Sequence, residues 1–421
     1  MRRHWMAKKK QGTAIVVGAG IVGVSTAYAL QTAGFQVTLV DRVGPCAGTS
    51  YGNAGAIVDG CTPNAMPGFW KSVPSMLLDP AGPLSIRWSY LPKILPWMIR
   101  FMQESRPERV EHNAGALKNL TGAAVADWGR LMKSAGLQHM IEDVGWLKVY
   151  ETDEGFQATE SVRELMTRHD SKYQVLTADD IRDLEPHLNP IFKHGIFHNK
   201  SRFLPNPEKV VHGIADAFKH LGGEIVIADI SSIREEEDGI AAIGSSGTIK
   251  ADKLVLCTGA WSKNLAGQFG ANVPLDTERG YHLMLPVMAE KGLSRPVLHG
   301  EKSFVLTPME RGVRLTSQVE FAGLEMGPDF TRIRKMLPLA KKMLPALNTE
   351  EQDAWLGYRP SLPDSIPVIG PSPNNPNVIF AFGHQHFGMT LGPTTARLVR
   401  DIMIGKEPTI PLWPYRANRF G

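Results

Sequence analysis

The chain has 421 residues, enough for two or three domains at about 150 residues each. Its 46 Lys and Arg residues against 42 Asp and Glu residues leave a net charge of +4, which is too small to indicate nucleic-acid binding. A hydrophobic share of 43% excludes intrinsic disorder as the main state. The three cysteines, Cys46, Cys61 and Cys257, form no C-x-x-C pair, so we expect neither a disulfide framework nor a metal site built on them, and no metal elsewhere.

The N-terminal residues 1–11 carry five basic side chains and no apolar run follows them, as a signal peptide would require. No segment reaches 18 consecutive apolar residues, the length typical of a transmembrane helix. The sequence therefore predicts a basic tail on a cytoplasmic protein.

A β-α-β unit opens the folded part of the chain. Ala14–Val17 is a short apolar run typical of a strand buried on both faces. A glycine turn follows, and apolar residues at helical spacing predict a helix over Ile21–Ala33 that ends at Gly34. Phe35–Val40 predicts a second strand, and a right-handed crossover joins the two strands.

Further elements follow at intervals along the chain. The pattern predicts strands at Trp146–Tyr150, Glu224–Ala228, Leu254–Cys257 and Val378–Phe382, and helices at Ser161–His169, Asp179–Leu184, Pro207–Leu221 and Pro393–Met403. Strand-helix units thus recur in separate stretches of the chain, which indicates a discontinuous nucleotide-binding domain interrupted by a second domain. We expect the first domain at 12–60, 196–262 and 351–410, and the second at 61–195 and 263–350.

The turn after the first strand reads G-x-G-x-x-G, formed by Gly18, Gly20 and Gly23. Gly18 permits the tight turn, Gly20 lets a pyrophosphate approach the backbone, and Gly23 lets the helix pack on the sheet. Asp41 ends the second strand, where a carboxylate accepts hydrogen bonds from a ribose diol, and Arg42 beside it belongs with the cofactor residues. This element alone predicts a dinucleotide and leaves NAD and FAD open.

The loop after the second strand favours FAD. It contains Thr49, Ser50, Asn53, Ala54 and Gly55, and it resembles the Thr-Ser-x-x-Asn-Ala-Gly stretch of the FAD-dependent D-amino acid oxidase superfamily, above all its bacterial D-amino acid dehydrogenases. In that family this stretch lines the flavin and the pyrophosphate.

The resemblance extends along nearly the whole chain through three more blocks. They are Cys257–Ser262 with Thr258, Gly259 and Trp261, the Gly357-Tyr358-Arg359-Pro360 block with Pro363 and Asp364, and Gly383–Thr390 with Gly388, Met389 and Thr390. The first is similar to the family turn near the adenosine of FAD. The last is similar to its flavin loop, where a helix N-terminus stabilises negative charge on the reduced flavin. The implied fold is an α/β Rossmann-like FAD-binding domain with an inserted antiparallel-sheet substrate domain, α+β overall.

The resemblance also assigns candidate catalytic residues. Arg359 is expected to bind a substrate carboxylate through its planar fork of donors. Tyr281 is expected either to contact the substrate or to pack in the core, and His384 either to polarise the substrate or to be structural. Family members with covalent flavin often carry a His where this chain has Tyr51, or a Cys near the C-terminal flavin loop, so we expect non-covalent FAD.

The segment 67–102 is rich in aromatic, aliphatic and basic residues. It contains Trp70, Trp88 and Trp97 with Lys71, Arg87, Lys93 and Arg100. Its prolines prevent one long helix. Such a composition suits either the protein's own core or a dimer contact, or else an interfacial segment that meets the inner face of the cytoplasmic membrane.

The resemblance implies FAD-dependent oxidation of the Cα–N bond of a D-amino acid, or of a cyclic D-imino acid such as D-proline or hydroxy-D-proline. Electrons are expected to pass to a quinone or another respiratory acceptor. One alternative is an oxidase of the glycine or sarcosine type that uses O₂ and produces H₂O₂. An alternative of another class is an FAD electron-transfer subunit of a larger complex, against which Arg359 argues.

Overall fold

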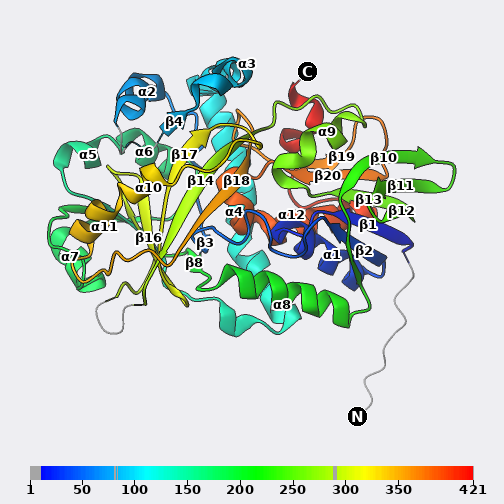
Figure 1. Ribbon diagram of the computed structural model, residues 1–421, viewed down its shortest axis with the longest axis horizontal. Coiled ribbons are helices and arrows are strands. Elements are labelled where there is room, and N and C mark those ends of the chain that lie inside the picture. The colour runs from blue at the N-terminus through cyan, green and yellow to red at the C-terminus, as the bar shows by residue number, and fades with distance from the viewer. Residues whose placement is uncertain (1–10, 80–81, 83, 288–291, 421) are drawn as a thin grey trace, which may run out of the picture.

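The computed structural model describes residues 11–79, 82, 84–287 and 292–420. The predicted basic tail therefore lies outside the described residues except for Gln11. The side chains of Trp70 and Lys71 in the segment 67–102 also lie outside the described part. Figure 1 shows two sheets side by side, one at each end of the long axis of the molecule.

The first sheet has six strands and carries the predicted β-α-β unit. In spatial order they are β19 (Val368–Pro371), β20 (Val378–Phe382), β13 (Lys253–Leu256), β1 (Thr13–Val17), β2 (Gln36–Asp41) and β9 (Glu224–Ile227). Neighbours from β20 to β9 are parallel, and β19 is antiparallel to β20. Residues 14–17 of β1 are buried because helices cover one face and a small antiparallel sheet covers the other.

The first face of this sheet is covered by helices α1 (Ile21–Ala33), α8 (Pro207–His220) and α12 (Gly388–Met403). Helix α1 has the predicted bounds and ends at Gly34, whose φ of 105° is the left-handed conformation that glycine adopts at little cost. The opposite face is covered by β10 (Ile230–Glu236), β11 (Gly239–Gly244), β12 (Gly247–Ala251) and α9 (Ser262–Gly267).

The second sheet is mainly antiparallel, as expected. Its strands run in the order β18 (Asp353–Ser361), β14 (Asp276–Leu285), β17 (Gly312–Phe321), β16 (Phe304–Met309), β15 (Val297–His299), β5 (Trp146–Tyr150), β7 (His194–His198) and β6 (Gln174–Thr177), and β4 (Leu84–Ile86) pairs with β17. The β15–β5 and β17–β4 pairs are parallel. The Rossmann-like domain with a second, largely antiparallel domain is thus confirmed.

Shorter elements surround the second sheet. They are α5 (Asp153–Gln157), α6 (Glu160–Arg168), α7 (Ala178–Leu184), α10 (Thr331–Arg334) and α11 (Leu337–Met343), and a two-stranded ribbon of β3 (Ala56–Ile57) and β8 (Arg202–Phe203). Predicted helices at 161–169 and 179–184 correspond to α6 and α7.

Three boundaries differ from the predicted division of the chain. Strand β18 lies inside the predicted nucleotide segment 351–410, yet it pairs along its length with β14 of the second sheet. Strand β7 begins at His194, two residues before the predicted boundary at 196. The long helix α4 (Pro107–Ala135), which the sequence reading missed, lies within 61–195 but buries Leu120 and Trp128 in the core of the first domain, against α12.

Helix α12 begins at Gly388, five residues before the predicted start at Pro393. A proline inside a helix removes a hydrogen bond to the carbonyl four residues earlier, which here belongs to Met389. The indole of Trp128 on α4 donates to that oxygen at 3.0 Å and to the oxygen of Thr390 at 3.1 Å. The tertiary contact therefore supplies the donor that Pro393 lacks, and the helix starts one turn earlier.

The segment 67–102 forms two helices, α2 (Phe69–Leu78) and α3 (Leu91–Glu104), which lie together at the top edge of the molecule in Figure 1. Trp97 packs in the core with Phe101 and is only 6% exposed, which agrees with the core alternative for this residue. Trp88 is 84% exposed. Within the described parts of the chain, no helix is both long and apolar enough to cross a bilayer.

Candidate functional site

The turn between β1 and α1 is built for close approach. Gly18 has φ of 103°, and a Cβ atom added there would lie 2.4 Å from the carbonyl oxygen of Cys257. A Cβ atom at Gly23 lies 1.7 Å from the carbonyl oxygen of Gly18, so this glycine permits helix packing rather than ligand contact. Gly20, the residue before α1, has no side chain with which to cap the helix, and the first N–H group of α1, that of Ile21, is instead bonded by Ser50.

Asp41 fixes this turn from the end of β2. Its Oδ2 accepts from the Ala19 N–H at 2.8 Å, and its Oδ1 accepts from the N–H groups of Val43 and Gly44 at 2.9 and 3.0 Å. Beside it, the Arg42 guanidinium lies 3.9 Å from the centre of the Trp261 ring. Thr258 and Gly259 complete this part of the wall.

The loop after β2 crosses from one domain to the other. Ser50 Oγ accepts from the Ile21 N–H at 2.9 Å, and Thr49 Oγ1 donates to the carbonyl of Tyr358 on β18 at 2.9 Å. Asn53 closes the loop internally, since its side chain bonds the Ser50 carbonyl and the Gly55 N–H. Gly55 has φ of 65° and no space for a side chain against the Leu204 carbonyl, so its role is in the turn.

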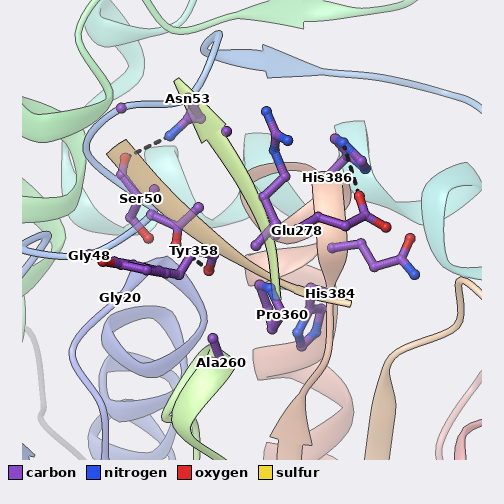
Figure 2. Close-up of a pocket in the computed structure, with 18 of the residues that line it drawn as sticks. Gly20, Gly48, Ser50, Asn53, Ala260, Glu278, Tyr358, Pro360, His384 and His386 are labelled. Carbon is purple, nitrogen blue, oxygen red and sulfur yellow. Dashed lines mark hydrogen bonds and ion pairs between the residues drawn. The ribbon is translucent and has the colours of Figure 1, made fainter. Parts of the chain in front are cut away.

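One cavity of about 1290 Å³ joins these elements, larger than the roughly 300–1,000 Å³ of an ordinary ligand pocket. Figure 2 shows Gly20, Gly48 and Ser50 on one side of it and Glu278, His384 and His386 on the other. All predicted site residues line this cavity except Gly23 and Gly55. The lining therefore includes the predicted catalytic residues Arg359, Tyr281 and His384, and also Ala54.

The N-terminus of α12 reaches the same cavity. Gly388, Met389 and Thr390 line it, and no side chain caps the helix at Phe387. Two helix N-termini on one large cavity, each with glycine at its start, suit a ligand that carries a pyrophosphate at one end and, at the other, a ring that becomes negatively charged. These residues fit FAD.

Arg359 crosses over β14 to reach the neighbouring strand. Its Nη1 donates to the carbonyl of Gln318 on β17 at 2.9 Å. This path is open because Gly280 has no side chain. A Cβ atom added there would lie only 2.0 Å from Nη2 of Arg359. Gln318 has φ of 76° and sits in a bulge of β17, which turns its carbonyl toward the guanidinium. Burial lowers the pKa of Arg359.

Tyr281 points its hydroxyl to the other side of β14. The hydroxyl donates to Glu320 and accepts from the Asp329 N–H at 3.2 Å, and the ring packs edge-on against Phe330. Burial and Glu320 raise the pKa of Tyr281.

His384 is 4% exposed, and its Nε2 lies 2.9 Å from the Thr395 hydroxyl of α12. Burial lowers its pKa to about 3, so the ring is neutral.

Four polar or aromatic residues of this wall are not among the predicted site residues, namely Glu278, Gln318, Trp355 and His386. Along β14, one face of the sheet carries Glu278, Gly280 and His282, and the other face carries Arg279 and Tyr281. On β18, Trp355 lies on the same face as its partner His282. The Trp355 indole stacks on His282 with 5.1 Å between ring centres, and a side chain at Gly52 would meet it. The alternation of faces along β14, the strand paired with that of Arg359, is the signal that could have identified Glu278.

The fold and the cavity together define an FAD-dependent oxidoreductase of the Rossmann type. Residues 13–402 match the family model described as "FAD dependent oxidoreductase", DAO, and the chain belongs to this family. FAD is accordingly its cofactor.

Two relatives illustrate the likeness in sequence. The chain is 34% identical over 417 residues to a D-amino-acid oxidase of Bradyrhizobium diazoefficiens, covering 96% of this chain and 98% of the relative. It is 28% identical over 415 residues to a D-amino acid dehydrogenase of Paramagnetospirillum magneticum, with the same shares covered. Among solved structures, glycine oxidase from Geobacillus kaustophilus gives a TM-score of 0.74 at 18% identity, covering 97% of this chain and 98% of that chain, a likeness of fold.

Proposed function

We propose that this protein oxidises the Cα–N bond of a D-amino acid or a cyclic D-imino acid and passes the electrons to a quinone or another respiratory acceptor. The names of the two relatives support the amino acid as substrate. FAD, when bound, supplies the two-electron acceptor for the substrate.

The observation that carries the proposal is the guanidinium of Arg359 inside the cavity. In the described part of the chain this side chain has a hydrogen bond to a carbonyl and no ion pair with a carboxylate. Its other donors are therefore free for the carboxylate of a substrate, with which a guanidinium forms a two-point contact. A subunit that only transferred electrons would have no need of this group.

The roles of the remaining candidates follow from their contacts. We assign the α12 N-terminus to stabilising negative charge near the flavin, and Gly18, Gly20, Asp41 and Arg42 to the adenosine and phosphates. For Tyr281 and His384 we favour positioning roles, because the hydroxyl of Tyr281 and one ring nitrogen of His384 are held by protein partners.

A substrate panel tests the reaction. The purified holoenzyme is mixed with D- and L-amino acids and with D-proline and hydroxy-D-proline, and reduction of an artificial dye is followed. We expect dye reduction with D-enantiomers and with the 2-oxo acid or cyclic imine as product. A yellow holoenzyme that reduces the dye with none of these compounds would refute the proposal.

The acceptor proposal draws on the outer surface of α2 and α3. Leu78 at the end of α2 and Trp88 in the turn before α3 are 82% and 84% exposed, and Leu95, Ile99 and Met102 on α3 are each about half exposed. Lys93 and Arg100 are exposed on the same helix, α3. Exposed aromatic and aliphatic side chains with basic neighbours suit the headgroup region of a membrane. On their inner side these helices contribute Phe69, Trp97 and Met98 to the cavity wall, so they lie between the site and the exposed side chains.

Vesicle sedimentation and acceptor assays separate this from the oxidase alternative, which the name of the Bradyrhizobium relative favours. We expect salt-sensitive binding to anionic vesicles and quinone reduction faster than oxygen consumption. A chain without residues 1–11 shows whether the basic tail causes the binding. Rapid H₂O₂ production without vesicle binding or quinone reduction would establish the oxidase instead.

A further inference from the structure

A buried carboxylate stands beside Arg359 in the cavity wall. Glu278 on β14 is the direct cross-strand partner of Arg359 on β18, so both side chains point to the same face of the sheet. Glu278 is 3% exposed and lines the cavity. Burying a carboxylate is costly unless a partner compensates for the lost water.

The protein does not supply a full set of partners for this group. Among the described residues, the Oε2 atom of Glu278 has no hydrogen-bond partner, and no ion pair joins it to Arg359. In the described ranges, Nε2 of His386 lies 3.7 Å from this Oε2 atom, the contact drawn as a dashed line in Figure 2. At this distance the ring forms no hydrogen bond with the carboxylate, and the positive charge of Arg359 beside it disfavours protonation of His386.

We propose that Glu278 binds the ammonium group of the substrate and accepts its proton, so that one wall of the cavity holds both charges of a zwitterionic amino acid. The inference rests on the proposed function, because it requires a substrate that carries an amine next to its carboxylate. Arg359 binds the carboxylate of the substrate. Glu278, the cross-strand partner of Arg359, binds its amino group.

The proton transfer is balanced within the site. One N–H bond of the ammonium group breaks and one O–H bond forms on Glu278, which leaves a neutral amine and a neutral carboxylic acid without any change in oxidation state. The neutral amine is the form whose lone pair assists loss of hydride from Cα. Burial raises the pKa of Glu278, with Arg359, Ser361 and Asn64 opposing the rise, so the gap between the pKa of the carboxyl and that of the ammonium group becomes smaller.

The groups around Glu278 set its charge. Arg359 from β18 and His386 from the turn before α12 face it, and Asp276 lies on the same face of β14. Asp276 accepts from the hydroxyl of Tyr90 and does not line the cavity. It is therefore the matched control: an acid of the same strand and face with a protein partner of its own.

Two ligands that cannot react test the inference by binding alone. 2-Aminoisobutyrate has an ammonium group and a carboxylate but no hydrogen on Cα, and pivalate is its isostere with a methyl group in place of the ammonium. Binding of each to the FAD-loaded protein is followed by the change in the flavin absorption spectrum. The wild-type protein is expected to bind 2-aminoisobutyrate at least about 10-fold more tightly than pivalate at pH 7.

Glu278→Gln is expected to weaken binding of 2-aminoisobutyrate by about 10- to 150-fold, since a charge-assisted contact is lost, while pivalate binds as well as before or better. The variant then requires the free amine, so its affinity for 2-aminoisobutyrate rises about tenfold per pH unit toward the pKa of the ligand. Asp276→Asn is expected to behave like the wild type.

Several results would overturn the inference. These are equal binding of both ligands by the wild type, an unchanged preference in Glu278→Gln, or equal weakening of both ligands by it. The wild-type comparison decides the question even if Glu278→Gln does not fold. A holoenzyme that oxidises no amino acid refutes the proposed function as a whole, whereas one that oxidises D-amino acids but shows any of these results refutes only the role of Glu278.

Discussion

Replacing Gly280 by alanine is the sharpest test of how Arg359 is placed. The added methyl group would lie 2.0 Å from Nη2, 2.2 Å from Cζ and 2.6 Å from Nη1 of Arg359. Carbon and nitrogen atoms pack at about 3.5 Å or more, so the guanidinium must move by roughly 1.5 Å. The clash involves the end of a flexible side chain rather than backbone, so the fold and FAD binding are expected to persist.

The cost falls on substrate recognition. A shift of this size breaks the 2.9 Å hydrogen bond from Nη1 to the Gln318 carbonyl and displaces the carboxylate contact. A hydrogen bond to a charged group contributes about 1.5–3 kcal/mol, which corresponds to a loss in kcat/KM of roughly 10- to 150-fold. The thermal midpoint of the variant is expected to stay close to that of the wild type.

Dye reduction by Gly280→Ala is compared with that by Gly129→Ala, whose site on α4 has no atom within 4 Å of an added Cβ. The decisive measurement is Gly280→Ala in an Arg359→Leu background, where no guanidinium is left to displace. We expect the alanine to cost little there. An equal loss in both backgrounds, or near-normal kcat/KM in the single variant, would refute the proposed path of Arg359 over β14.

Other changes have equally direct outcomes. Arg359→Leu is expected to retain FAD but to lose about 30- to 1000-fold in kcat/KM, with partial rescue in Arg359→Lys, whereas Arg334→Leu at the exposed pair with Glu351 changes neither quantity. Acid or heat denaturation is expected to release the FAD into solution, and yellow colour that stays with the precipitate would indicate a covalent link. Burial lowers the pKa of His198, His282 and His384 to about 3, so the unfolded chain binds protons below pH 6.5 that the folded chain does not. The unfolding free energy is therefore at its full value above pH 6.5 and falls toward pH 3 by about 1.4 kcal/mol per pH unit for each histidine, and a thermal midpoint that is constant from pH 7 to 5 would contradict this.

The nucleotide-binding turn could be predicted because its signals are local. The glycines, the apolar run of β1 and the end of α1 depend on backbone conformations that neighbouring residues determine. The start of α12 could not be predicted, because the donor that compensates for Pro393 comes from Trp128, more than 250 residues earlier.

The substrate wall was only partly predictable for the same reason. The block around Arg359 indicated a carboxylate site, yet the residues that let the guanidinium reach Gln318 lie on two other strands. The segment Glu278–His282 mixes polar and apolar residues on both faces, so its pattern does not show that Glu278 rather than Tyr281 has its polar group on the cavity side. That assignment depends on the pairing with β18, which the predicted domain boundary placed elsewhere.

The discontinuity of the first sheet has a consequence during protein synthesis. Strands β1 and β2 leave the ribosome early, but β20 and α12 follow more than 300 residues later. At about 5–20 residues per second the early strands wait roughly 20 to 70 s for their last partners. During that time the apolar face of α1 that α12 will cover is open to wrong partners, so production of this protein should depend on chaperone supply and improve at low temperature. Nascent chains that stop before Val378 lack the helix that closes this core, and they are expected to be degraded without ever acquiring FAD.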